Sequence, residues 1–281
     1  MPETDGNPVR RATAVLRADD VAYTYWYEYA LRHHGSKTVL ISLYLLVDSV
    51  DAAKTCLQSA GWLPGEDPLH TPHYHDPAID ARAVLELPGV EYSTVVLLDV
   101  ATWAGITPSA APEDSDHYPS LPQLYNALAQ RFLDTDDDEH RRYLNIQLGY
   151  LYMDCPALAT PDFLASLPAD IRQLHLDFRS AELNMTAPGT VAHERDIRER
   201  AQRGEWTLMR EGSASVGGTR LNRDLEAKLL ADANERLRAL YPEVGEEEDA
   251  DVDAAEAEAE AGDGEGGARD DSIQAQARVV D

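Results

Sequence analysis

A chain of 281 residues with 43% hydrophobic content is long and apolar enough to bury a sizeable core, as one large domain or two small ones. Its formal net charge of -27 and its total of only 24 Lys and Arg residues argue against nucleic acid or an anionic membrane surface as a partner, because both attract clustered basic side chains. The longest apolar run, residues 39–47, is too short to span a bilayer, so we expect a soluble intracellular protein, cytoplasmic with a nuclear location left open.

The N-terminal segment predicts a flexible end followed by a helix. Residues 1–12 are rich in Pro, Gly, Asn and charge and should be flexible. A helix is expected from Asp19 or Asp20 to about residue 34, because apolar side chains recur at helical spacing after a capping aspartate. Its five aromatic residues cover more than one face, and we assign them to core packing rather than to a ligand platform.

Residues 35–62 carry the clearest structural pattern in the chain. The β-branched and aliphatic run 38–47 predicts a largely buried strand. Short polar side chains within 48–51 can cap a helix over 50–60. Gly61 should end that helix, because a residue without a Cβ suits the left-handed conformation at this position. A strand followed directly by a helix indicates an α/β or α+β fold.

The next segment predicts two strands joined as a hairpin. We expect them over residues 82–87 and 90–100, with a tight turn at Pro88 and Gly89. Hairpin pairing is antiparallel, so the sheet should be small and mixed or antiparallel, with flanking helices. The predicted fold class is therefore α+β.

From residue 121 onward the pattern is helical. Amphipathic spacing predicts helices over residues 121–133, 139–153, 160–167, 169–178 and 221–241. Residues 193–204 are strongly charged, and their Glu and Arg spacing predicts a solvated helix rather than a buried one.

The predicted elements divide the chain into four parts. These are a flexible N-terminus over 1–12, an α+β core over 13–110, a helical region packed on it over 111–242, and a tail over 243–281. The tail holds 15 acidic and 2 basic residues and almost no large apolar side chain, so it should be disordered. We interpret it as a solubilising tail, with binding of a basic protein as the alternative.

The order of helix, Gly35-Ser36, strand and helix carries a family resemblance over roughly residues 19–100. The approach ALRHHGSKT and the exit YLLV resemble the start of a nucleotidyltransferase-like domain. The segment is also similar to a group of uncharacterised fungal proteins built on a degenerate form of that core. The resemblance implies a cofactor-binding role for Gly35 and Ser36. It also implies a following strand with an Asp-x-Asp pair and a third carboxylate on a neighbouring strand.

The strand that should carry the Asp-x-Asp pair departs from the family pattern. Enzymes of this kind hold two divalent ions between paired carboxylates. Ser42 and Tyr44 stand at the expected positions, and neither replaces a carboxylate as a ligand for a hard cation. We therefore expect no catalytic residue and no cofactor. The predicted protein is a pseudoenzyme with an inactive nucleotidyltransferase-like domain and a binding or scaffolding role.

Two carboxylates keep an enzyme open as the alternative. Asp48 shares the strand face of Ser42 and Tyr44 by the period of two, and Asp99 could stand in place of the third carboxylate. Together they could hold one Mg²⁺ and support a metal-dependent nucleotidyltransferase. Each also has a simpler interpretation, since Asp48 can cap a helix and Asp99 can end a strand.

A second candidate set is the pattern H-x-x-H-x-H-D formed by His70, His73 and His75. Imidazoles at such spacing can bind zinc when a loop gathers them. However, Pro72 and Pro77 imply an extended backbone, in which His73 and His75 share one face while His70 points elsewhere. We favour a solvated loop over a metal site.

The remaining residues with reactive side chains form no recognisable motif. Cys56 and Cys155 lie far apart and in no metal-like spacing, so we interpret them as buried thiols. The chain has no P-loop, nucleophile elbow or dinucleotide-binding fingerprint. Ser213, beside Gly212, is interpreted as a loop residue.

Overall fold

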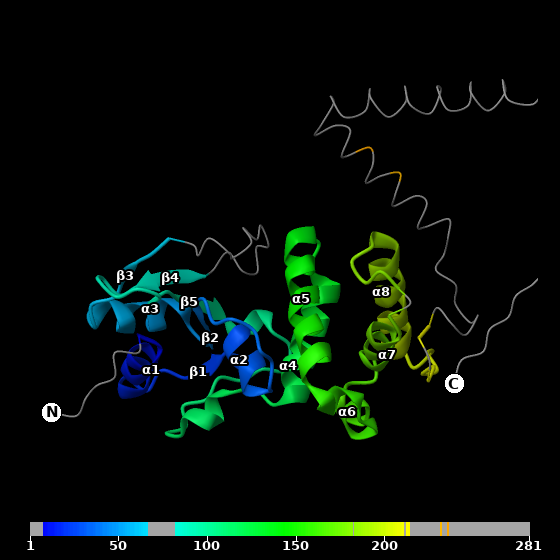
Figure 1. Cartoon of the computed structure of the whole chain (residues 1–281), viewed down its shortest axis with the longest axis horizontal. Coiled ribbons are helices and arrows are strands. Elements are labelled where there is room, and N and C mark those ends of the chain that lie inside the picture. The colour runs from blue at the N-terminus through cyan, green and yellow to red at the C-terminus, as the bar shows by residue number, and fades with distance from the viewer. Residues whose placement is uncertain are drawn as a thin grey trace, which may run out of the picture. The chain divides into compact units, whose positions relative to one another are not determined.

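A five-stranded mixed sheet with helices on both faces organises the fold, which is α+β (Figure 1). This computed structural model describes residues 8–66, 82–181, 183–210, 212–213, 231 and 235. The chain forms two compact units, residues 1–226 and 227–281, and the fold described below belongs to the first. Three expectations lie outside the described residues: the histidines at 70, 73 and 75, the acidic tail, and nearly all of the helix predicted over 221–241.

The sheet confirms the predicted mixed arrangement. Its strands are β1 (Tyr23–Tyr25), β2 (Leu43–Val47), β3 (Leu63–Pro64), β4 (Ala83–Glu86) and β5 (Val95–Asp99), in the order β1-β2-β5-β4-β3. Strands β2 and β5 run parallel, with Val47 opposite Asp99, and the other neighbours pair antiparallel. As predicted, β4 and β5 form a hairpin, although both strands are shorter than expected.

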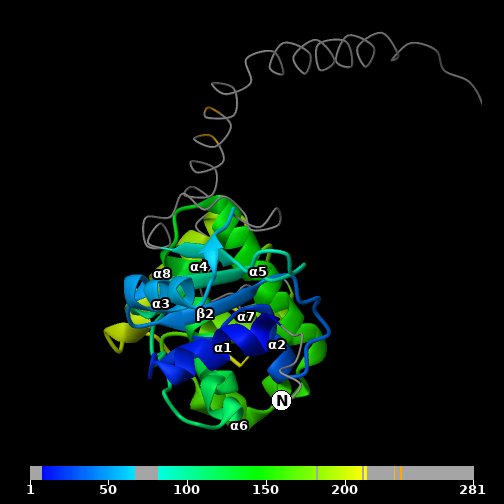
Figure 2. The same ribbon diagram turned by 90° about the vertical axis from the view of Figure 1, so that its left-hand side faces the viewer.

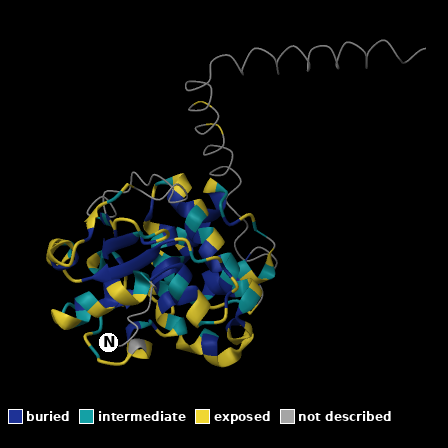
Figure 3. Cartoon of the chain, turned by 60° about the vertical axis from the view of Figure 1, so that its left-hand side comes forward, coloured by how far each residue is buried: buried dark blue, intermediate teal, exposed yellow. Residues whose placement is uncertain are grey.

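Two hydrophobic clusters cover the two faces of the sheet. The helices are α1 (Pro8–Ala18), α2 (Glu28–His33), α3 (Val50–Ser59), α4 (Leu121–Asp134), α5 (Asp138–Asp154), α6 (Pro161–Ser166), α7 (Arg172–Ser180) and α8 (Pro188–Gln202). Leu45 packs with α1 and α3, whereas its neighbour Leu46 packs with α2, α4 and α5. Figure 2 shows α1 and α3 in front of β2 with the other helices behind, and Figure 3 shows the strands buried between them. In the part of the chain that the structure describes, no helix is long and apolar enough to cross a membrane.

The prediction of one helix from residue 19 or 20 to residue 34 is wrong. Residues Tyr23–Tyr25 form β1 instead, and α2 begins only at Glu28. Pairing with β2 satisfies the backbone of this segment while its aromatic side chains become buried, so tertiary contacts override the helical spacing. Tyr27, at a φ of 45°, separates strand from helix. The assignment of the aromatic residues to packing is confirmed for four of the five, Tyr23, Tyr25, Trp26 and Tyr27, which are at most 2% exposed.

Two predicted boundaries also change. Residues 8–12, expected to be flexible, form the start of α1, because Ala12 and Leu16 are fully buried in the cluster that contains α3. The strand predicted over 38–47 is limited to the five residues of β2, and residues 38–42 belong to no helix or strand.

The charged helix expected to be solvated is instead buried along one side. Helix α8 begins at Pro188, before the predicted start at residue 193. Its buried residues are Gly189, Thr190, Val191, His193, Glu194 and Ile197. The pairs Arg200–Asp196 and Arg203–Glu199 do follow the predicted i,i+4 spacing, at 3.7 and 3.9 Å. The predicted pairing of Glu or Asp with Arg therefore applies to the C-terminal turns of α8 only. The first turns are buried along one face.

Candidate functional site

Gly35 and Ser36 lie in the turn after α2, and the C-terminal end of α5 closes over them. Gly35 has a φ of 99°, in the left-handed region that favours a residue without a Cβ. The Ser36 hydroxyl donates to Asp154 Oδ2 at 3.2 Å, and the Lys37 backbone N–H donates to the same oxygen at 2.9 Å. The Cys155 thiol also donates to the carbonyl oxygen of His34. Asp154 therefore accepts from Ser36, one of the two residues to which the resemblance assigns cofactor binding, and from the neighbouring Lys37.

The two positions expected to carry the metal-binding Asp-x-Asp pair are buried in the core. Ser42 is 4% exposed and Tyr44 is 6% exposed. The Tyr44 ring packs edge-to-face on Tyr27 with centroids 5.2 Å apart, and the Tyr44 carbonyl accepts the Trp26 backbone N–H at 3.0 Å. This part of β2 is packed against neighbouring aromatic rings.

Asp48 and Asp99 lie at the same edge of the sheet, where the parallel strands β2 and β5 end. Val47 is the register partner of Asp99, and Asp48 follows Val47 directly. Because alternate strand residues point to opposite faces, this placement favours opposite faces for the two carboxylates. Asp99 Oδ1 accepts the Ala101 backbone N–H at 2.8 Å, while Asp48 is exposed. Ser49 is the N-cap of α3. The shared Mg²⁺ ion stays a prediction.

A buried polar cluster between α7 and α8 brings together residues that the sequence did not group. Its members are Asp177, His193, Glu194 and Ser213, which are 0%, 7%, 1% and 0% exposed. One oxygen from each carboxylate and one imidazole nitrogen all lie within 4.8 Å of one another. We call these four residues the α7–α8 cluster.

Hydrogen-bond directions in the α7–α8 cluster fix the role of Ser213. Its hydroxyl donates to Asp177 Oδ2 at 2.6 Å, and its backbone N–H donates to Asp177 Oδ1. His193 Nε2 lies 2.8 Å from the same hydroxyl oxygen and must therefore carry the hydrogen that it shares with Ser213. An activated serine nucleophile needs the reverse arrangement, in which the imidazole accepts the hydroxyl proton. The cluster is thus not arranged for nucleophilic catalysis.

Glu194 differs from its neighbours because neither of its buried carboxylate oxygens has a hydrogen-bond partner. Among the described residues, no Lys or Arg forms an ion pair with Glu194 or Asp177. Burial, followed by the nearby Asp177 carboxylate, raises the pKa of Glu194 well above its usual value of 4.5. Burial also lowers the pKa of His193, which favours a neutral imidazole. The cluster is acidic in composition and holds no positive charge of its own.

Gly212 allows the chain to approach α7 closely enough to place Ser213 in the cluster. A Cβ at Gly212 would collide with the side chain of Ser180 and lie 3.3 Å from Asp177 Oδ1. A residue with a side chain would therefore displace this segment from α7. Gly212 is thus a local requirement for the bonds between Ser213 and Asp177.

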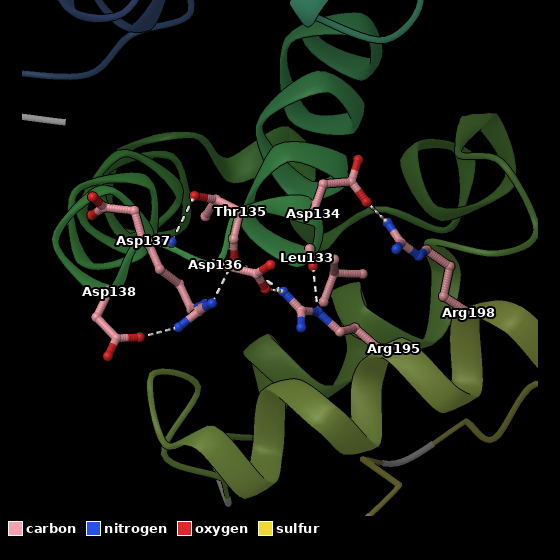
Figure 4. Close-up of polar contacts among 9 residues, drawn as sticks. Leu133, Asp134, Thr135, Asp136, Asp137, Asp138, Arg195 and Arg198 are labelled. Carbon is pink, nitrogen blue, oxygen red and sulfur yellow. Dashed lines mark hydrogen bonds and ion pairs between the residues drawn. The ribbon is translucent and has the colours of Figure 1, made fainter. Parts of the chain in front are cut away.

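Two arginines of α8 bind the segment around the C-terminal end of α4, away from the α7–α8 cluster (Figure 4). Arg195 donates to the carbonyl oxygen of Leu133, in the last turn of α4, and to that of Thr135, which follows α4. It also donates to Asp136 Oδ1 at 3.0 Å. Arg198 contacts Asp134 Oδ1 at 2.7 Å. The position of α8 therefore does not depend on contacts within the α7–α8 cluster alone.

A second buried chain of polar groups joins α4, α5 and α7. His175 Nε2 lies 3.1 Å from the carbonyl oxygen of Leu158 and must donate to it, so Nδ1 accepts the Tyr152 hydroxyl proton at 2.8 Å. Tyr152 in turn accepts from the Tyr125 hydroxyl at 2.7 Å. Burial, followed by the Arg179 charge, lowers the pKa of His175 to about 4, which keeps this ring neutral at neutral pH. The Tyr152 hydroxyl also has a second, longer acceptor in the carbonyl oxygen of His175, at 3.3 Å.

Sequence reasoning missed the α7–α8 cluster because its members come from separate segments with no short spacing pattern. Asp177 and His193 lie on different helices, and Ser213 was interpreted as a loop residue. Cys56 and Cys155, by contrast, are buried free thiols as predicted. Protein-family models, curated proteins and solved structures contain no match to this chain.

Proposed function

We propose that the chain is a binding or scaffolding protein, built on a nucleotidyltransferase-like core that no longer transfers nucleotidyl groups. The observation that carries the proposal is the acceptance of both the Ser36 hydroxyl and the Lys37 backbone N–H by Asp154. A nucleotide phosphate bound at Gly35 and Ser36 would compete for the Ser36 hydroxyl, and it would meet a carboxylate of like charge there. The buried Ser42 and Tyr44 support the same conclusion, because neither is a ligand for a hard cation.

Two exposed apolar residues lie on the segments that meet at this closed turn, and we propose them as contacts for a binding partner. Val39 is 71% exposed and Met153 is 74% exposed. The bond between Lys37 and Asp154 brings their two segments together, since Val39 lies two residues after Lys37 and Met153 directly precedes Asp154. The proposed ligand is therefore a protein that contributes apolar side chains.

Calorimetric titration with ATP in the presence of Mg²⁺ or Mn²⁺ tests the inactive state of the core. We expect no binding by the full chain. The alternative, a metal-dependent nucleotidyltransferase that uses Asp48 and Asp99, predicts ion-dependent ATP binding that Asp99→Ala abolishes. That result would overturn the proposal.

The binding role needs a separate test with matched surface variants. Photo-crosslinking residues placed at positions 39 and 153 of the full chain should capture a partner, whereas position 63 should not. Leu63 is a suitable control because it is also apolar and 55% exposed, but lies on the edge strand β3. Val39→Glu should abolish the association, and Leu63→Glu should leave it intact. Loss of association only on deletion of residues 243–281 would instead favour the acidic tail and a basic partner.

A further inference from the structure

We propose that Asp177, His193 and Glu194 form a buried site for one divalent transition-metal ion of the zinc class, which fastens α7 to α8. The three side chains come from two helices and are all buried. This role is independent of the proposed binding function, because neither Val39 nor Asp154 takes part in it.

The spacing of the ligand atoms suits a metal ion. One atom from each residue lies within 4.8 Å of the other two. Metal–ligand bonds of about 2.0–2.1 Å place two ligands of a tetrahedral zinc site roughly 3.3–3.5 Å apart. The three side chains would therefore need to move inward by at most about an ångström, which side-chain rotation can supply.

Glu194 is the independent observation that points to a cation. It is 1% exposed and directed at Asp177, yet neither of its oxygens receives a hydrogen bond. A buried carboxylate without a donor or a counter-charge is costly. Asp177 is different, since it accepts hydrogen bonds from Ser213 and Gln173. A cation bound between the two acids would supply the positive counter-charge that Glu194 lacks.

The donor set favours a transition metal over Mg²⁺ or Ca²⁺. Those two ions prefer oxygen ligands only, whereas imidazole suits zinc and its neighbours in the first transition series. The His193 ring can present Nε2 to an ion once that nitrogen gives up its hydrogen. Ser213 Oγ lies 2.8 Å from His193 Nε2 and 2.6 Å from Asp177 Oδ2, so an ion bound by these two residues would replace the hydrogen bonds that Ser213 makes with them.

The direct test is a zinc titration of the full chain after treatment with a chelator. We expect calorimetry to show one site of micromolar or tighter affinity, and Glu194→Gln to weaken it by about tenfold or more. The substitution keeps the side-chain shape and removes the charge. Co²⁺ provides a second measurement, because a low-symmetry site with an imidazole ligand gives visible absorption bands that Glu194→Gln should remove.

Matched controls separate this site from other groups that bind metals. A triple variant with His70, His73 and His75 changed to Asn should keep the site, and so should Asp136→Asn, which removes an exposed acid near α8. Three results would overturn the proposal. They are no stoichiometric zinc binding by the wild type, equal affinity in Glu194→Gln, or loss of the site in the triple histidine variant. Arg195 and Arg198 hold α8 without the ion, so the metal-free protein should stay folded for these measurements.

Discussion

Removal of the Asp154 carboxylate should destabilise the chain by opening the turn that contains Gly35 and Ser36. In Asp154→Ala, the Ser36 hydroxyl and the Lys37 backbone N–H both lose their acceptor. Asp154→Asn keeps one oxygen for these donors but removes the charge. We therefore expect unfolding free energies in the order wild type, Asp154→Asn, Asp154→Ala.

The size of the effect follows from the exposure of the groups. A hydrogen bond to a charged group contributes roughly 1.5–3 kcal/mol. Asp154 is half-buried and Lys37 is exposed, so water replaces part of this contribution. We expect Asp154→Ala to cost about 1–2 kcal/mol in total. In a unit of this size, that loss corresponds to a fall in Tm of roughly 2–8 °C.

Urea unfolding monitored by tryptophan fluorescence can measure this loss. The midpoint should fall while the slope of the free energy against urea stays constant. Glu91→Ala is the matched control, because Glu91 is an exposed acid, and its effect should stay within about 0.5 kcal/mol. Inorganic phosphate should raise the Tm of Asp154→Ala and leave that of the wild type unchanged, since only the variant has free donors.

Two outcomes would refute this reasoning. If Asp154→Ala were as stable as Glu91→Ala, the carboxylate would not close the turn in solution. If phosphate stabilised the wild type as strongly as the variant, the turn would already be open to an anion. The second result would also weaken the proposal that the core is inactive.

Two further predictions concern buried polar groups in the helical half and at its contact with the sheet. Burial raises the pKa of Glu28 above its usual value of 4.5, so the folded state binds more protons than the unfolded state above pH 4.5. The stability of the wild type relative to Glu28→Gln should therefore fall as pH rises from 4.5 through the folded pKa, and a constant difference in urea midpoint across this range would contradict it. Tyr152→Phe removes the hydroxyl between Tyr125 and His175 and should cost about 1–3 kcal/mol. Tyr125→Phe, which removes only the first donor, should cost less, and equal losses would contradict the assigned hydrogen-bond direction.

Local signals predicted the elements that depend on local chemistry. Helix α3 lies within one residue of its predicted bounds, because Ser49 caps it and Gly61 follows it with a φ of 94°. Helix α4 begins at the predicted residue 121, where the Ser120 backbone N–H donates to the Gln123 side chain at 3.0 Å. The two partners of each capping bond lie within three or four residues of each other, so a short stretch of sequence shows both.

Contacts between distant segments decided the elements that were predicted wrongly. Apolar spacing in residues 20–34 fits a helix, but pairing with β2 makes Tyr23–Tyr25 a strand. For α8, the charged residues hid the burial of Val191 and Ile197, which shows that one face packs against the body. His193 and Glu194 lie beside those two residues, and this is the only local sign that they are buried too.

Asp154 and Glu194 show why residue type alone could not locate a functional site in this chain. Asp154 was part of no motif, yet it has two donors and therefore a structural role. Glu194 belonged to a run of charges that looked solvated, yet it is buried and has no donor. A protein can keep a buried acid in three ways, with hydrogen-bond donors, with a proton or with a cation. Among the residues that the structure describes, none donates a hydrogen bond to Glu194, so the choice lies between a proton shared with Asp177 and a metal ion. The two nearby groups, His193 and Asp177, are both suited to ligate a metal, and the zinc titration of the wild type and Glu194→Gln distinguishes an ion from a shared proton.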